Sequence, residues 1–226
     1  SIQSASILTT GVGFMSKLEE IRSVVEAGRL RYVEDLIHQA LGEGYTPAQI
    51  LEQAMVPAMR SAGEHYKSNE SDIPKILAAA RCMRRGLDVL EPYIEKDQGS
   101  HVIGKVILGT VEGDLHDVGK NLVAIMFRSA GFQVIDLGVD VSEKQFLKAV
   151  RENPDVSIVC LSSLLTTSMG AMRQVVRTLR EAKDTRLLRI MVGGGSVTKE
   201  FAEEIGADAY SETAVEAAEL AKTFLI

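Results

Sequence analysis

The sequence predicts an α/β protein in two parts, an N-terminal four-helix bundle followed by a doubly wound parallel five-stranded domain of the Rossmann-like, flavodoxin-like kind. Two observations support this class. Apolar residues follow helical spacing from Ser16 to about Ile94, whereas from Val102 onward short apolar runs alternate with helical segments. A polar stretch without any period, EKDQGSH at 95–101, separates the two patterns.

The first part contains four apolar stripes at helical spacing, which begin near residues 16, 30, 46 and 74. Ser16 and Glu19 have the spacing of a capping box, and Thr46-Pro47 has the pattern of an N-cap followed by proline in the first turn. Pro57 falls inside the third stripe and should bend or break that helix. Four amphipathic helices with short connections predict a small antiparallel bundle.

The expected division is an N-terminal arm or expression remnant at 1–15, a helical domain at 16–94, a linker at 95–101 and a second domain at 102–226. In the second domain the expected strands are KVILGTV, FQVIDLG, VSIVCLS, LRIMVGG and a weaker ADAY. Helices are expected near 118–130, 142–152, 168–183, 197–205 and 213–225. Strands that are apolar on both faces are typical of a buried parallel sheet, whose ligands bind beyond the carboxyl ends of the strands.

The turn after the first of these strands, EGDLHDVGKN at 112–121, falls at that carboxyl edge. Asp114 and His116 are two residues apart, so one turn can join carboxylate and imidazole, which fixes the tautomer and makes the other ring nitrogen a better ligand or base. The alternative is a plain capping loop, with acidic side chains at a helix start, an idle histidine and Gly119 needed only for packing. Spacing alone leaves the two interpretations evenly balanced.

Two further loops at this edge favour a binding site. The third strand ends in a hydroxyl-rich run at 162–168, which has more hydroxyls than one N-cap needs. The fourth ends in Gly193-Gly194-Gly195-Ser196, where a ligand can approach the backbone closely. Neither a G-x-G-x-x-G dinucleotide fingerprint nor a G-x-x-x-x-G-K-S/T phosphate loop occurs.

Composition limits the function. The formal net charge of −6 argues against a nucleic-acid partner. No apolar run approaches the 18 residues of a membrane span. The sequence also shows no basic segment followed by an apolar one, the pattern of a secretory leader. Cys82 and Cys160 lie among apolar neighbours without metal-ligand spacing, which favours buried thiols over a structural zinc site or a disulfide. We therefore expect a cytoplasmic protein.

The order of the motifs resembles the cobalamin-binding domain of corrinoid proteins. D-x-H-x-x-G at 114–119, S-x-L at 162–164 and G-G at 193–194 follow one another in that order. Upstream, GEHYKSNESDIPKILAAARCMRRGLDVLEPYIE resembles the helical cap of cobalamin-dependent methionine synthase and of methyltransferase corrinoid proteins. The resemblance spans about residues 16–226.

The resemblance implies a role for each matching residue. His116 would be the lower axial ligand of cobalt, Asp114 would hydrogen-bond its far nitrogen, and Ser162 would hydrogen-bond Asp114, so that these three are the expected catalytic residues. Over the upper face of the cofactor, the positions of the shielding cap residues fall on Tyr66 and Ile73, for which ordinary bundle core is the alternative. The other expected cofactor-binding residues are Leu115, Asp117, Val118, Gly119, Leu164, Thr166, Gly193, Gly194 and Gly195, with a looser match at Ala209-Tyr210.

The function implied is a methyl carrier without activity of its own. It would accept a methyl group on cob(I)alamin from a substrate methyltransferase and, as methylcobalamin, donate it to an acceptor methyltransferase that uses tetrahydrofolate or a thiol. A reductive activase would be a third partner. The alternatives are a subunit of an adenosylcobalamin-dependent isomerase, a cobalamin-sensing module, and a flavodoxin-like domain without a corrinoid. Methylamines, methoxylated aromatics, methanol and betaines are all candidate methyl donors, with the first two favoured.

Overall fold

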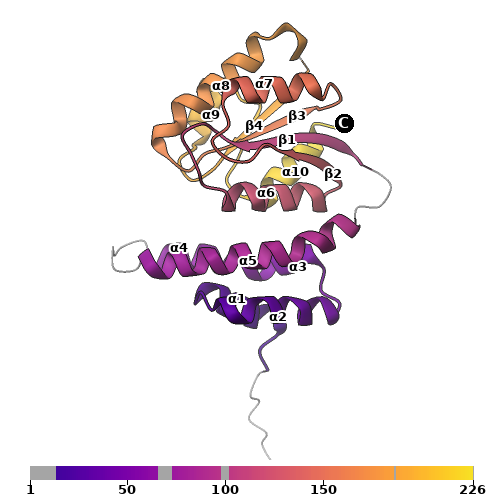
Figure 1. Cartoon of the computed structure of the whole chain (residues 1–226), viewed down its shortest axis with the longest axis vertical. Coiled ribbons are helices and arrows are strands. Elements are labelled where there is room, and N and C mark those ends of the chain that lie inside the picture. Colours follow the sequence, from indigo (N-terminus) through magenta and orange to yellow (C-terminus); the bar gives the residue numbers. More distant parts are fainter. Residues whose placement is uncertain (1–13, 66–72, 98–101, 186, 226) are drawn as a thin grey trace, which may run out of the picture.

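The computed structural model describes residues 14–65, 73–97, 102–185 and 187–225. The cap and the sheet domain lie one above the other, with the long helix α5 (Ile73–Asp97) beneath α6 (Val118–Ser129) of the sheet domain (Figure 1). None of the helices in the described ranges is long and apolar enough to cross a membrane. The predicted fold class is confirmed.

The cap is built from α1 (Lys17–Glu26), α2 (Leu30–Gly42), a third rod and α5. The predicted capping box of Ser16 with Glu19 is present. The predicted N-cap Thr46 also forms one, because its hydroxyl accepts from the backbone N–H of Gln49 and the Gln49 side chain accepts from the backbone N–H of Thr46. At the C-terminal end of the cap, α5 continues to Asp97. Residues 95–97, which sequence reasoning assigned to the linker, therefore belong to a helix. Residues 1–13 and 98–101 lie outside the described residues.

The third rod runs through α3 (Pro47–Ile50), a π-helical turn (Leu51–Met55) and α4 (Val56–His65). Pro57 has no N–H to donate, and the turn before it widens so that the N–H of Val56 reaches the carbonyl of Leu51. The rod thus continues past the proline through a wider turn, where sequence reasoning predicted a bend or a break.

The sheet domain has five parallel strands in the order β2-β1-β3-β4-β5, the order expected of a flavodoxin-like sheet. Their bounds are β1 Gly104–Thr110, β2 Phe132–Asp136, β3 Ile158–Ser162, β4 Arg189–Gly193 and β5 Ala209–Ser211. The remaining α-helices are α7 (Glu143–Glu152), α8 (Met169–Glu181), α9 (Lys199–Ile205) and α10 (Ala214–Thr223). Every predicted strand and helix of this domain is present.

Alternate residues of each strand face opposite layers. Val106, Leu108 and Cys160 share one buried cluster with residues of α6, α10 and the cap, while Ile107 and Val159 share another with residues of α7, α8 and α9. The cap is therefore joined to the sheet domain through an apolar core that passes through α6. Beside that core, buried Lys120 pairs with Asp136 at 2.6 Å, which links the start of α6 to the end of β2.

Both cysteines are buried free thiols, Cys82 in α5 and Cys160 in β3. Burial raises the pKa of Cys82 to about 11 and that of Cys160 to about 12. Because the thiolate is the reactive form, we expect neither to react with an aromatic disulfide reagent at pH 8 in the folded protein, and both to react in guanidinium. Release of two chromophore equivalents without denaturant would contradict this prediction.

Candidate functional site

The loop between β1 and α6, residues 111–117, lies at the carboxyl edge of the sheet and is held at both ends. The N–H of Asp114 donates to the carbonyl of Val111 at 3.2 Å, and the buried Thr110 hydroxyl donates to the carbonyl of His116 at 2.9 Å. Asp140, from the loop after β2, accepts from the N–H of Gly113 at 2.7 Å. One hydrogen bond within the loop and contacts from two neighbouring segments thus determine where Asp114 and His116 stand.

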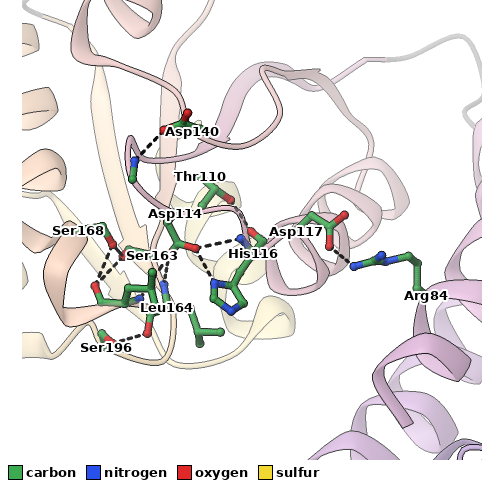
Figure 2. Close-up of polar contacts among 12 residues, drawn as sticks. Arg84, Thr110, Asp114, His116, Asp117, Asp140, Ser163, Leu164, Ser168 and Ser196 are labelled. Carbon is green, nitrogen blue, oxygen red and sulfur yellow. Dashed lines mark hydrogen bonds and ion pairs between the residues drawn. The ribbon is translucent and has the colours of Figure 1, made fainter. Parts of the chain in front are cut away.

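Asp114 and His116 form the centre of the site (Figure 2). Oδ1 of Asp114 accepts from Nδ1 of the His116 ring at 2.6 Å and from the backbone N–H of His116 at 2.9 Å. A carboxylate accepts and does not donate, so the ring proton lies on Nδ1 and the lone pair on Nε2. The pairing predicted from the sequence is present in the structure.

The second oxygen of Asp114 is fully occupied as well. Oδ2 accepts from the N–H groups of Leu164 and Leu165, at 2.6 and 3.3 Å, and from the hydroxyl of Ser163 at 3.4 Å. Burial raises the pKa of Asp114, but the backbone N–H groups of Leu164 and His116 and the His116 ring lower it by more, so the net pKa lies below its ordinary value. Asp114 is therefore a buried anion that holds a half-exposed imidazole.

The hydroxyl at Asp114 belongs to Ser163, one residue beyond Ser162, for which this contact was expected, so the expected contact is corrected. Ser162 is the last residue of β3 and, by alternation, faces the same layer as Cys160. At Ser163 the chain leaves the strand and the side chain is buried toward Asp114, where it also contacts the hydroxyl of Ser168 at 2.6 Å. Ser162 instead lies in the wall of the adjoining cavity.

A cavity of about 920 Å³ lies between this edge of the sheet and the cap. Its volume is near the upper end of the range for small-molecule sites. The cap contributes Val56, Met59 and Arg60 from α4. The sheet domain contributes Leu108, His116, Gly119, Leu122, Val123, Cys160, Leu161, Ser162, Ser163, Leu164, Gly193, Gly194, Gly195, Val197 and the stretch 210–215.

The glycines in this wall leave room that side chains would take. Apart from its chain neighbours and the backbone of its own helix, no atom of the described residues lies within 4 Å of the place where a Cβ at Gly119 would stand, so a side chain there would extend into open cavity. Gly194 is needed for a different reason, since a Cβ there would lie 1.9 Å from the carbonyl oxygen of Ser163. The chain is thus shaped to keep the cavity open beside an imidazole, which fits a bulky ligand with a metal centre.

Seven of the predicted ligand-contacting residues line this cavity: His116, Gly119, Ser162, Leu164, Gly193, Gly194 and Gly195. Of the looser match, Tyr210 lines it and Ala209 does not. Asp114 stands behind His116. Leu115 and Thr166 are exposed away from the wall, Asp117 pairs with Arg84 of the cap, and Val118 packs against the core. Tyr66, and the side chain of Ile73, lie outside the described residues.

Sequence reasoning missed several residues of the site. Ser163 and Ser168 belong to the hydroxyl-rich run at 162–168, but the sequence of the run does not indicate which of its side chains turn inward. Arg60 and Arg84 lie on cap helices with no local signal, because their place at the site depends on how the two domains pack.

Comparison with known proteins identifies two domains in the chain. The B12 binding domain family matches residues 104–219, and a second family, also described as a B12 binding domain, matches residues 17–91. The chain is 38% identical over 209 residues to trimethylamine corrinoid protein 2 of Methanosarcina acetivorans, a match that covers 90% of this chain and 95% of that protein.

Solved structures give the same result. The monomethylamine corrinoid protein of Methanosarcina barkeri superposes with a TM-score of 0.80 at 30% identity, covering 91% of this chain and 96% of that one. A chain of the methanol:cobalamin methyltransferase complex of Methanosarcina barkeri matches with a TM-score of 0.51 at 25% identity, covering 92% and 79%.

Proposed function

This chain belongs to the family of B12-binding corrinoid proteins, and we propose that it carries methyl groups on cobalamin within a multi-component methyltransferase system. The observation that carries the proposal is His116, whose ring is tied through Nδ1 to a buried carboxylate and forms part of a large cavity wall. A bound corrinoid supplies a cobalt centre that accepts a methyl group from one molecule and passes it to another.

In this proposal His116 would hold the cobalt of the corrinoid through Nε2. Asp114 holds the ring in the tautomer that leaves Nε2 unprotonated, and its charge would stabilise the imidazolium if Nε2 took up a proton instead. Ser163 and the N–H groups of Leu164 and Leu165 keep Asp114 ionised and fixed.

The cavity wall suits the remainder of the cofactor. Ser162, Leu164 and the run Gly193–Gly195 would surround the nucleotide tail, and Gly119 would leave it a passage beside α6. The apolar cap residues Val56 and Met59 would keep water from the opposite side. We infer that the helical part, 16–94, covers the cofactor and separates from the domain at 102–226 when a methyltransferase docks.

The methyl donor in this proposal is an N-methylated amine. The support is the similarity to corrinoid proteins named for trimethylamine, dimethylamine and monomethylamine. The likeness to a chain of the methanol:cobalamin methyltransferase complex supports a separate substrate methyltransferase as partner. A second methyltransferase, which uses tetrahydrofolate or a thiol, and a reductive activase complete the proposed set of partners.

Reconstitution tests the proposal directly. The apo protein, incubated with hydroxocobalamin and passed through a desalting column, should retain one corrinoid per chain. After reduction to the cob(I)alamin state, methyl iodide should convert the bound corrinoid to a methylated form that a methylamine-type methyltransferase also produces from its amine. Retention of no corrinoid would refute cobalamin binding, and methylation by methyl iodide alone would refute the amine donor while leaving the carrier proposal in place.

A further inference from the structure

Asp117, the residue after His116, occupies the N-cap position of α6 but does not cap that helix. Its Oδ1 accepts instead from Nη2 of Arg84 at 2.6 Å, across the boundary between the sheet domain and the cap (Figure 2). Aspartate is among the favoured N-cap residues because its carboxylate accepts from the second or third N–H of the helix. The docked cap therefore holds a carboxylate that the helix could otherwise use.

The ion pair lies at one end of the cap's contact with α6. Arg84 is on α5, and a second pair, Arg128 with Glu91 at 2.9 Å, joins the last turn of α6 to the same cap helix. The neighbouring Arg85 pairs with Glu34 inside the cap. Arg84 thus reaches across the domain boundary, whereas Arg85, next to it in sequence, does not.

Both partners of the Arg84–Asp117 pair are accessible to water, with 53% and 34% of their side chains exposed. Exposed ion pairs of this kind are weak and are screened by salt, so the contact opens readily. The start of α6 offers an alternative partner, because the first N–H groups of a helix have no acceptor within the helix and lie at the positive end of its dipole. A released Asp117 carboxylate would therefore gain a new partner close by.

We propose that Asp117 is a positioning residue with two alternative partners: Arg84 while the cap is docked, and the first-turn N–H groups of α6 once the cap separates. The exchange offsets part of the cost of opening the cap. It also ties the position of the cap to the loop that carries His116, because Asp117 follows His116 directly in the chain.

Amide hydrogen exchange of the full-length apo protein tests this proposal, so the outcome does not depend on cofactor binding. In Arg84→Gln, the N–H groups of Gly119 and Lys120 should exchange about fivefold more slowly than in the wild type, the protection that an ordinary N-cap gives. High salt should slow these amides in the wild type too. Adding Asp117→Ala to Arg84→Gln should abolish the gain.

Cap docking is followed separately with a fluorescent pair on Asp35→Cys in α2 and Lys144→Cys in α7, both exposed residues. The helices α2 and α7 lie on opposite sides of the boundary between the cap and the sheet domain (Figure 1). The buried native cysteines leave these sites open to selective labelling. Arg84→Gln and Asp117→Ala should each shift the docking equilibrium toward separation by up to about fivefold, the upper limit for an exposed pair. Arg85→Gln is the matched control and should change neither readout.

If the Arg84–Asp117 pair were purely structural, its loss in Arg84→Gln would weaken docking without slowing the exchange of any amide. If Arg84→Gln leaves the exchange of Gly119 and Lys120 unchanged or faster, the partner exchange is refuted. If the protection persists in the double variant, a group other than Asp117 caps the helix, and the proposal is refuted as well. Circular dichroism of each variant establishes that the comparison is between folded proteins.

Discussion

Replacing His116 with alanine should abolish the histidine-ligated visible spectrum of the cobalamin-loaded protein while most of the cofactor stays bound. The His116 ring forms part of the cavity wall, with its lone pair on Nε2. The wall also includes residues of β3, β4, the β5–α10 loop and the cap, whose contacts the substitution leaves intact. The measurement is the absorbance spectrum of the reconstituted variant at neutral pH, with the corrinoid counted per chain.

Two controls make this result specific. His38→Ala removes another half-exposed histidine, which lies on the cap beside Tyr93 and outside the cavity, and should leave the spectrum unchanged. Free imidazole added to the His116→Ala protein should restore a nitrogen-ligated spectrum, because the truncated side chain leaves room for it. A wild-type spectrum in His116→Ala would refute the assignment of His116 as a cobalt ligand and would favour the interpretation of the turn at 112–121 as a helix cap.

The periodicity of apolar residues, and the polar segments that separate the apolar runs, were enough to place the elements of the sheet domain. Apolar runs such as VSIVCLS, separated by helical segments, have the pattern of buried parallel strands. The change from strand pattern to helix pattern after β1 places Asp114 and His116 at the carboxyl edge of the sheet. Because these two residues are close in sequence, their pairing was also predictable.

What the sequence did not reveal depends on geometry beyond a single element. Alternation assigns Ser162 to one face of β3, but the phase is lost where the strand ends, so the inward turn of Ser163 toward Asp114 was not predictable. Pro57 indicated that its helix would be irregular, but it did not indicate the π-helical turn that allows the helix to continue past the proline. The Arg84–Asp117 pair joins residues 33 positions apart in two domains, and nothing local in the sequence indicates it.

Gly194→Ala should be among the most damaging single substitutions at the site that leave the imidazole and its carboxylate in place. Gly194 has φ +118°, a conformation that residues with a side chain rarely adopt, and its added Cβ would lie 1.9 Å from the carbonyl oxygen and 2.7 Å from the carbonyl carbon of Ser163. These are backbone atoms at the end of β3, which cannot turn aside as a side chain does. We expect a loss of about 3 kcal/mol in unfolding free energy, from combined strain and overpacking.

The loss should extend to the site, because Ser163 is the residue displaced. Its N–H donates to the carbonyl of Gly193 at 3.1 Å and its hydroxyl reaches Asp114, so moving it loosens the group that holds His116. We therefore expect weaker cobalamin retention as well as a lower urea midpoint, measured on the same preparation.

Gly195→Ala separates this mechanism from the general cost of filling a glycine-rich loop. Its Cβ would meet Cδ1 of Leu164 at 2.6 Å, the far end of a flexible and partly exposed side chain, and its φ lies outside the left-handed region. Leu164 can rotate away, so we expect a cost below about 1 kcal/mol. Equal losses for the two variants would mean that the loop tolerates no side chain at all, and that the contact between Gly194 and Ser163 is not what maintains the site.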